Sequence, residues 1–172
     1  MTGPQRSGTT LGARVLAELT GLEYVDEEHF GVHDCRRFEA LLAGSTVRSK
    51  GVVIHCPAMS RWVHHYSTEQ RCIVFMLRDI DQINASAERV GWNYEPELAK
   101  YKDIVLNGAR APMLNVTRGN LVHLTYEYWQ QVQRPACKHW LEVHFDTLRG
   151  HPLFVPDHQR EHFALRQWRV NQ

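Results

Sequence analysis

The fold is decided by a stretch at the start of the chain, Gly3-Pro4-Gln5-Arg6-Ser7-Gly8-Thr9-Thr10. It has the spacing of a phosphate-binding loop, in which four residues separate two glycines. The glycines let the backbone curl until successive N–H groups point at an anion, and the N-terminus of the following helix adds positive charge. Nucleoside triphosphatases carry a lysine directly after the second glycine. Here that position is Thr9, and the cation lies inside the loop, at Arg6.

Apolar residues predict strands and helices in alternation along the rest of the chain. Strands are predicted at residues 22–25, 52–54, 72–77 and 140–145, of which 52–54 and 72–77 are uninterrupted apolar runs. Apolar residues on one helical face predict helices at residues 9–19, 34–43 and 120–132, and Pro57 suits the start of a helix at 58–66. Further helices are predicted at residues 79–90, 95–106 and 159–165. This alternation favours an α/β fold with a parallel sheet and helices on both faces. We therefore expect one domain, residues 1–172, of the three-layer phosphate-loop type.

The loop lies unusually close to the start of the sequence. A phosphate-binding loop normally follows a buried strand that fixes its position. Here only Met1 and Thr2 precede Gly3, so the first strand is expected to be missing or truncated.

The composition is that of an ordinary globular domain. The chain has 172 residues, 43% of them hydrophobic and 23% charged, with a formal net charge of +1. This charge gives no overall attraction to nucleic acid or membrane, so neither is predicted as a partner. The four cysteines show no paired spacing and the 11 histidines no zinc spacing, which predicts free thiols and no metal. With no leader or membrane-length apolar run, a cytoplasmic location is expected.

The loop resembles the 5′-phosphosulfate loop of sulfotransferases, in which Lys or Arg precedes Ser-Gly-Thr-Thr. The match is closest to tyrosylprotein sulfotransferases, with Gln5 in place of their proline. A second match is Arg78 at the end of a predicted strand, with Ser86 eight residues later. A third, weaker match is Phe145-Asp146-Thr147-Leu148, which follows the last predicted strand and suggests a structural element. The family's Arg-Lys-Gly segment has no counterpart.

The resemblance implies transfer of a sulfuryl group from 3′-phosphoadenosine 5′-phosphosulfate to a hydroxyl or amine on a small molecule, glycan or peptide, without a metal. It implies that Arg78 and Ser86 bind the 3′-phosphate, and that Arg6 also takes part in catalysis. The residues implied to bind the 5′-phosphosulfate are Gln5, Arg6, Ser7, Gly8, Thr9 and Thr10.

The proton acceptor has two candidate positions. Glu27 lies 21 residues after Arg6, the separation found in tyrosylprotein sulfotransferases, and Glu28 is next to it. His55, in His55-Cys56-Pro57, resembles the catalytic histidine of cytosolic sulfotransferases. The sequence leaves this choice open, as it does the acceptor and the oligomeric state.

Two other functions remain open from the sequence. One is a phosphate-loop kinase or nucleotide hydrolase, which Thr9 and a best strand ending in Arg78 disfavour, because lysine and a metal-binding aspartate are expected there. The other is a non-catalytic nucleotide-binding module, for which the short segment before the loop argues.

Overall fold

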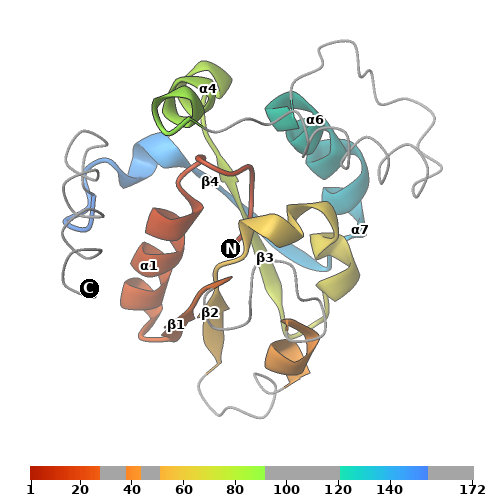
Figure 1. Cartoon of the computed structure of the whole chain (residues 1–172). Helices are drawn as coiled ribbons and strands as arrows, with labels where there is room; N and C mark the ends of the chain where they lie inside the picture. Colours follow the sequence, from red (N-terminus) through yellow and green to blue (C-terminus); the bar gives the residue numbers. More distant parts are fainter. Residues whose placement is uncertain (28–37, 44–50, 92–120, 155–172) are drawn as a thin grey trace.

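The computed structural model of the protein describes residues 1–27, 38–43, 51–91 and 121–154. These residues combine helices with short parallel strands, which confirms the predicted α/β class (Figure 1). The strands are β1 (Glu23–Val25), β2 (Val52–Ile54), β3 (Cys72–Leu77) and β4 (His139–His144). The α-helices are α1 (Thr9–Thr20), α4 (Ile80–Arg89), α6 (Leu121–Tyr128) and α7 (Arg134–Ala136). Three 3₁₀ segments, η1 (Pro57–Arg61), η2 (Val63–Tyr66) and η6 (Phe145–Leu148), and one π-helical turn, η5 (Trp129–Gln133), accompany them.

Met1 and Thr2 lie between two parallel pairs of strands, β1–β2 and β3–β4. Thr2 forms a parallel bridge with Phe75 of β3, and its N–H donates to Val74 O at 2.9 Å. On the other side, Cys56 N–H donates to Met1 O at 3.0 Å. The spatial order is therefore β1, β2, Met1–Thr2, β3, β4. The expected first strand is represented by this short bridged segment.

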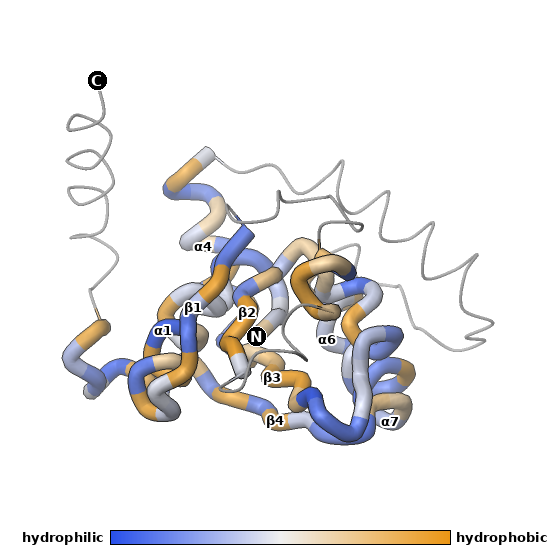
Figure 2. The backbone as a smooth tube through the Cα atoms, turned by 90° about the horizontal axis from the view of Figure 1, so that it is seen from below, coloured by the Kyte–Doolittle hydropathy of each residue, from blue (hydrophilic) through white to orange (hydrophobic). Residues whose placement is uncertain are grey.

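Helical elements cover both faces of these strands. On one face, Ala17 of α1 packs in a cluster with Val53. On the other, Phe38 packs with side chains of η1, and the fully buried Trp129 stacks on Phe75 with 4.3 Å between ring centroids. β2 and β3 are accordingly among the hydrophobic segments of the backbone (Figure 2). Strands covered on both faces are expected to be continuous apolar runs, and this pattern in β2 and β3 predicts them as strands.

The strand predicted at residues 72–77 and the helix predicted at 79–90 are confirmed as β3 and α4, the latter with ends shifted by one residue. The prediction of a single helix at 58–66 is wrong, because these residues form the 3₁₀ segments η1 and η2. Trp62 interrupts them with φ −125°, and the Ser60 carbonyl accepts a hydrogen bond from the Gln133 side chain at 2.8 Å. The helix predicted at 120–132 changes to π-helical geometry at Trp129. Those predicted at 95–106 and 159–165 lie outside the described residues.

Within the described residues, no helix has both the length and the apolar character needed to cross a bilayer. Cys56, Cys72 and Cys137 are free thiols, as their spacing predicted, and Cys35 lies outside the described residues.

Candidate functional site

Residues 3–8, the candidate phosphate-binding loop, connect Thr2 to α1 through a backbone with three positive φ angles. These are 144° at Gly3, 67° at Arg6 and 93° at Gly8. In the described part of the chain, Arg6 is the one non-glycine residue with positive φ, a conformation that costs about 1 kcal/mol or more. Gly8 has a second reason to be glycine, because a Cβ there would collide with the Phe145 ring. The loop is thus held against the segment that follows β4.

The first amides of α1 make no hydrogen bond within the helix and receive no side-chain cap from Gly8. Ser7 closes the turn, since its N–H and its hydroxyl donate to Pro4 O at 3.1 and 2.6 Å. The first bond into the helix runs from Gly12 N–H to Gly8 O, so the amides of the three residues before Gly12 have no carbonyl partner within the helix. No side chain caps this end, and its first turn contains no acidic residue. Such a helix start attracts anions.

Two arginines tie the loop to the end of β3 and to α4. Arg6 Nε donates to Ser86 Oγ at 3.1 Å, and Ser86 is buried on α4. Arg78, directly after β3, donates from Nη1 to Arg6 O at 3.0 Å. Among the described residues no carboxylate pairs with Arg6. The structure therefore brings Arg6, Arg78 and Ser86 together, while Gln5 lies half-buried in the same loop.

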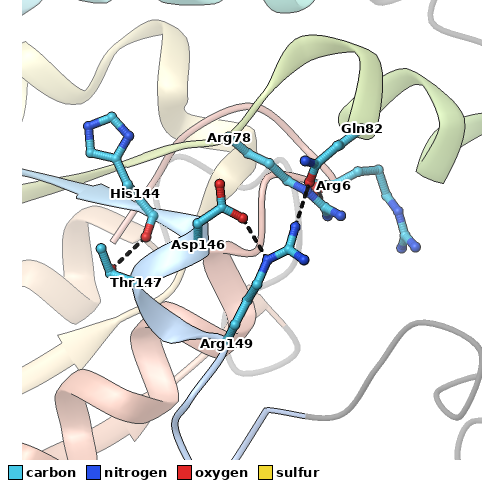
Figure 3. A network of polar contacts seen from close by, with 7 residues as sticks. All are labelled: Arg6, Arg78, Gln82, His144, Asp146, Thr147 and Arg149. Carbon is cyan, nitrogen blue, oxygen red and sulfur yellow. Dashed lines mark hydrogen bonds and ion pairs between the residues drawn. The ribbon is translucent and has the colours of Figure 1, made fainter.

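Three side chains that position Arg78 were not predicted from the sequence. The Arg78 guanidinium lies 4.0 Å from the centre of the Phe145 ring, within cation–π distance. Gln82 Oε1 accepts from Arg78 Nε at 3.3 Å and from Arg149 Nη2 at 3.2 Å (Figure 3). Gln82 follows Arg78 by four positions, the helical spacing that could have indicated a contact. Arg149 also forms an ion pair with Asp146. Its contact with Gln82, 67 positions away, has no spacing in the sequence that would indicate it.

A third element, α6, holds the backbone of Arg78. The hydroxyl of Tyr126 accepts from Arg78 N–H at 2.8 Å and donates to Arg78 O at 2.9 Å. Burial raises the pKa of Tyr126 to about 12, so the phenol stays protonated and able to donate. This double contact fixes the carboxyl end of β3.

His55, directly after β2, contacts the loop from the opposite side. Its Nε2 lies 3.0 Å from Thr9 Oγ1 and 3.4 Å from Thr10 Oγ1. Burial, helped by the positive charge of the Met1 amine, lowers the pKa of His55 to about 4. The side chain is therefore a neutral imidazole at pH 7, held beside the start of α1.

Glu27, which follows β1, has a hydrogen-bond partner other than the loop. Its Oε1 accepts from Ala58 N–H at 3.1 Å, at the start of η1. Burial, with the negative charge of Glu27 second, raises the pKa of Cys56 to about 12, which keeps that thiol protonated. Glu28 lies outside the described residues. Of the two described candidates, His55 is the one with direct hydrogen-bond contacts to Thr9 and Thr10.

Acid is expected to destabilise the protein through His55. Its pKa is about 4 when folded and 6.5 as a free side chain, so between these values the unfolded chain binds the proton and the folded one does not. The contribution of His55 to the free energy of unfolding is full well above pH 6.5, and it falls by about 3 kcal/mol as the pH drops to 4. Denaturant unfolding of wild type and His55→Gln between pH 7 and 4 checks this, because the variant lacks the imidazole. Equal pH dependence of both proteins would contradict it.

In the described residues, no group of three His, Cys, Asp or Glu side chains is placed to hold a metal ion. Comparisons of this chain with models of protein families, with curated proteins and with solved structures find no match.

Proposed function

We propose that the protein binds 3′-phosphoadenosine 5′-phosphosulfate and transfers its sulfuryl group to a hydroxyl or amine of a small molecule, glycan or peptide. One observation carries the proposal: the network through Arg6, Ser86 and Arg78 joins the loop to two neighbouring elements. The order β1, β2, Met1–Thr2, β3, β4, with helices on both faces, supports the finer proposal of a three-layer phosphate-loop domain. Ligands of such sheets bind outside the carboxyl ends of the strands.

The donor set suits a nucleotide with two separate anionic groups. The open amides at the start of α1, with Arg6 and the hydroxyls of Thr9 and Thr10, would hold the 5′-phosphosulfate. Arg78 and Ser86 would hold the 3′-phosphate, since a planar guanidinium and a hydroxyl match phosphate oxygens. The bound donor would supply an activated sulfuryl group.

His55 is the proposed proton acceptor. Its neutral imidazole is beside Thr9 and Thr10, where the sulfuryl group would lie. As the acceptor's oxygen or nitrogen bonds to sulfur, His55 takes its proton, and the sulfur–oxygen bond to the 5′-phosphate breaks with both electrons going to that phosphate. Arg6 and the helix amides stabilise the charge left there. An anion held close to His55 favours its imidazolium form, so the proton affinity of His55 would rise when the sulfuryl donor is bound.

Replacing Arg6 with alanine is expected to weaken binding of adenosine 3′,5′-bisphosphate at least about tenfold, because a hydrogen bond from a charged donor contributes about 1.5–3 kcal/mol. Calorimetric titration in EDTA measures the affinity. Arg134→Ala is the matched control, since Arg134 pairs with Glu142 and is outside the network.

Two results would contradict the proposed function. One is wild-type protein that fails to bind the bisphosphate in EDTA. The other is tighter binding of ATP with magnesium than of the bisphosphate, which would favour a kinase or hydrolase.

A further inference from the structure

Arg149, directly after η6, extends the arginine network by one guanidinium group (Figure 3). Gln82 Oε1 accepts from Arg149 Nη2 at 3.2 Å and from Arg78 Nε at 3.3 Å. Both guanidinium groups also lie within cation–π distance of the Phe145 ring, at 4.0 Å for Arg78 and 5.9 Å for Arg149. Two positive charges therefore share one amide oxygen and one aromatic ring.

Gln82 and Ser86 place the arginines along one face of α4. These two residues are four positions apart, so their side chains lie on the same side of the helix. Ser86 Oγ accepts from Arg6 Nε at 3.1 Å. Through Gln82, Arg149 is bound to the same helix face as the proposed 3′-phosphate position at Arg78 and Ser86.

The shared Gln82 oxygen is neutral, so it does not compensate the charges of two arginines. Repulsion between like charges is offset when an anion lies between them. A phosphate monoester carries a charge of about −1.5 to −2 at pH 7 and offers three acceptor oxygens, enough for two guanidinium groups. A phosphate at this position would thus be bound more tightly by Arg78 and Arg149 together than by Arg78 alone.

The Asp146 carboxylate holds Arg149 in its present position. Arg149 Nε donates to Asp146 Oδ1 at 2.6 Å, and this ion pair is exposed, with 52% of the Arg149 side chain and 66% of the Asp146 side chain accessible. Arg149 Nη1 has no hydrogen-bond partner among the described residues. An exposed ion pair contributes little to stability, so its exchange for a more highly charged anion is favourable.

We propose, on the basis of the function proposed above, that Arg149 is a specificity-determining residue for the 3′-phosphate, and that Asp146 competes with this phosphate for the Arg149 guanidinium. When the nucleotide binds, Arg149 exchanges the Asp146 carboxylate for a phosphate oxygen. Asp146 is then an internal anion that weakens nucleotide binding. The alternative is a purely structural pair, in which Asp146 and Arg149 only fix the end of η6 to α4.

The two explanations predict different signs for two single variants. Arg149→Ala is expected to weaken binding of adenosine 3′,5′-bisphosphate at least about fivefold, because a charged donor to phosphate is lost. Asp146→Asn is expected to strengthen it by up to about fivefold, because the competing carboxylate is removed. Binding of adenosine 5′-phosphate should change little in either variant, since this nucleotide has no 3′-phosphate. A structural pair would instead weaken binding in both variants.

The double variant, Asp146→Asn with Arg149→Ala, separates competition from a simple change of charge. If Asp146 acts by holding Arg149, the double variant binds the bisphosphate as weakly as Arg149→Ala. If the Asp146 charge acts directly on the nucleotide, its removal strengthens binding with or without Arg149. Glu69→Gln and Lys138→Ala are the matched controls, because they make the same charge changes in an exposed ion pair near the amino ends of β3 and β4. These controls should leave binding unchanged.

Affinities are measured by calorimetry in EDTA at one ionic strength, because salt screens exposed charges. Thermal unfolding without nucleotide should give Tm values within about 2 °C of wild type for every variant, as expected for exposed ion pairs.

The outcomes distinguish this inference from the proposed function. Wild type that binds the bisphosphate, with Arg149→Ala binding it equally well, would overturn the role of Arg149 and leave the proposed function standing. Weaker binding in both single variants, or a double variant that binds more tightly than Arg149→Ala, would overturn the exchange with Asp146. Wild type with no affinity for the bisphosphate would contradict both the inference and the proposed function.

Discussion

Replacing His55 with alanine is expected to lower the rate of sulfuryl transfer by about 10²–10⁴-fold, the usual effect of removing a general base. Its Nε2 lies 3.0 Å from Thr9 Oγ1, beside the proposed site of the transferred group. The measurement is single-turnover transfer to whichever sugar, phenol or peptide the wild type uses best. Affinity for adenosine 3′,5′-bisphosphate should change little, because the imidazole contacts threonine hydroxyls and contributes no positive charge at pH 7.

The matched control for this experiment is Glu27→Gln. Glutamine retains an oxygen that can accept from Ala58 N–H, so the start of η1 stays capped while the carboxylate is removed. Near-normal turnover is expected. Loss of turnover in Glu27→Gln with normal turnover in His55→Ala would assign the base to Glu27, and normal turnover in both would place the catalytic centre elsewhere.

Replacing Arg78 with alanine is expected to reduce selectivity for the 3′-phosphate by about 10–150-fold, the equivalent of about 1.5–3 kcal/mol for a hydrogen bond from a charged donor. Selectivity is the ratio of the affinities for adenosine 3′,5′-bisphosphate and adenosine 5′-phosphate, both measured by calorimetry. The ratio is the informative quantity, because Arg78 also holds the Arg6 carbonyl and stacks on Phe145, and damage to these contacts weakens both nucleotides.

Ser86→Ala provides the companion measurement. It removes the acceptor of Arg6 Nε on α4 without removing a charge, so a smaller loss of selectivity is expected. If Arg78→Ala weakens both nucleotides equally, Arg78 has a structural role only.

Sequence alone was sufficient where one local feature determines the structure. The continuous apolar run of β3 predicted both its ends, and strand ends placed Arg78 and His55 at the same edge of the sheet. The glycine spacing of the loop similarly predicted a tight turn before a helix, which Gly8 and α1 provide.

Sequence was insufficient where contacts across the chain decide the outcome. Pro57 favours the start of a helix, but η1 has 3₁₀ geometry, and the carbonyl of its Ser60 accepts a hydrogen bond from the Gln133 side chain, 73 positions away. The low pKa of His55 depends on burial and on the Met1 amine, which only the folded arrangement brings close. The contact of Gly8 with Phe145 joins two motifs that the sequence presents separately.

The double hydrogen bond from Tyr126 links two parts of the molecule thermodynamically. One phenol binds both backbone groups of Arg78, so the carboxyl end of β3 cannot shift independently of α6 without losing two hydrogen bonds. A ligand that selects one position of Arg78 therefore selects one position of α6. The coupling is reciprocal. If the proposed nucleotide selects this position of α6, a molecule that binds against α6 in the same position would strengthen nucleotide binding, and the nucleotide would strengthen binding of that molecule by the same factor.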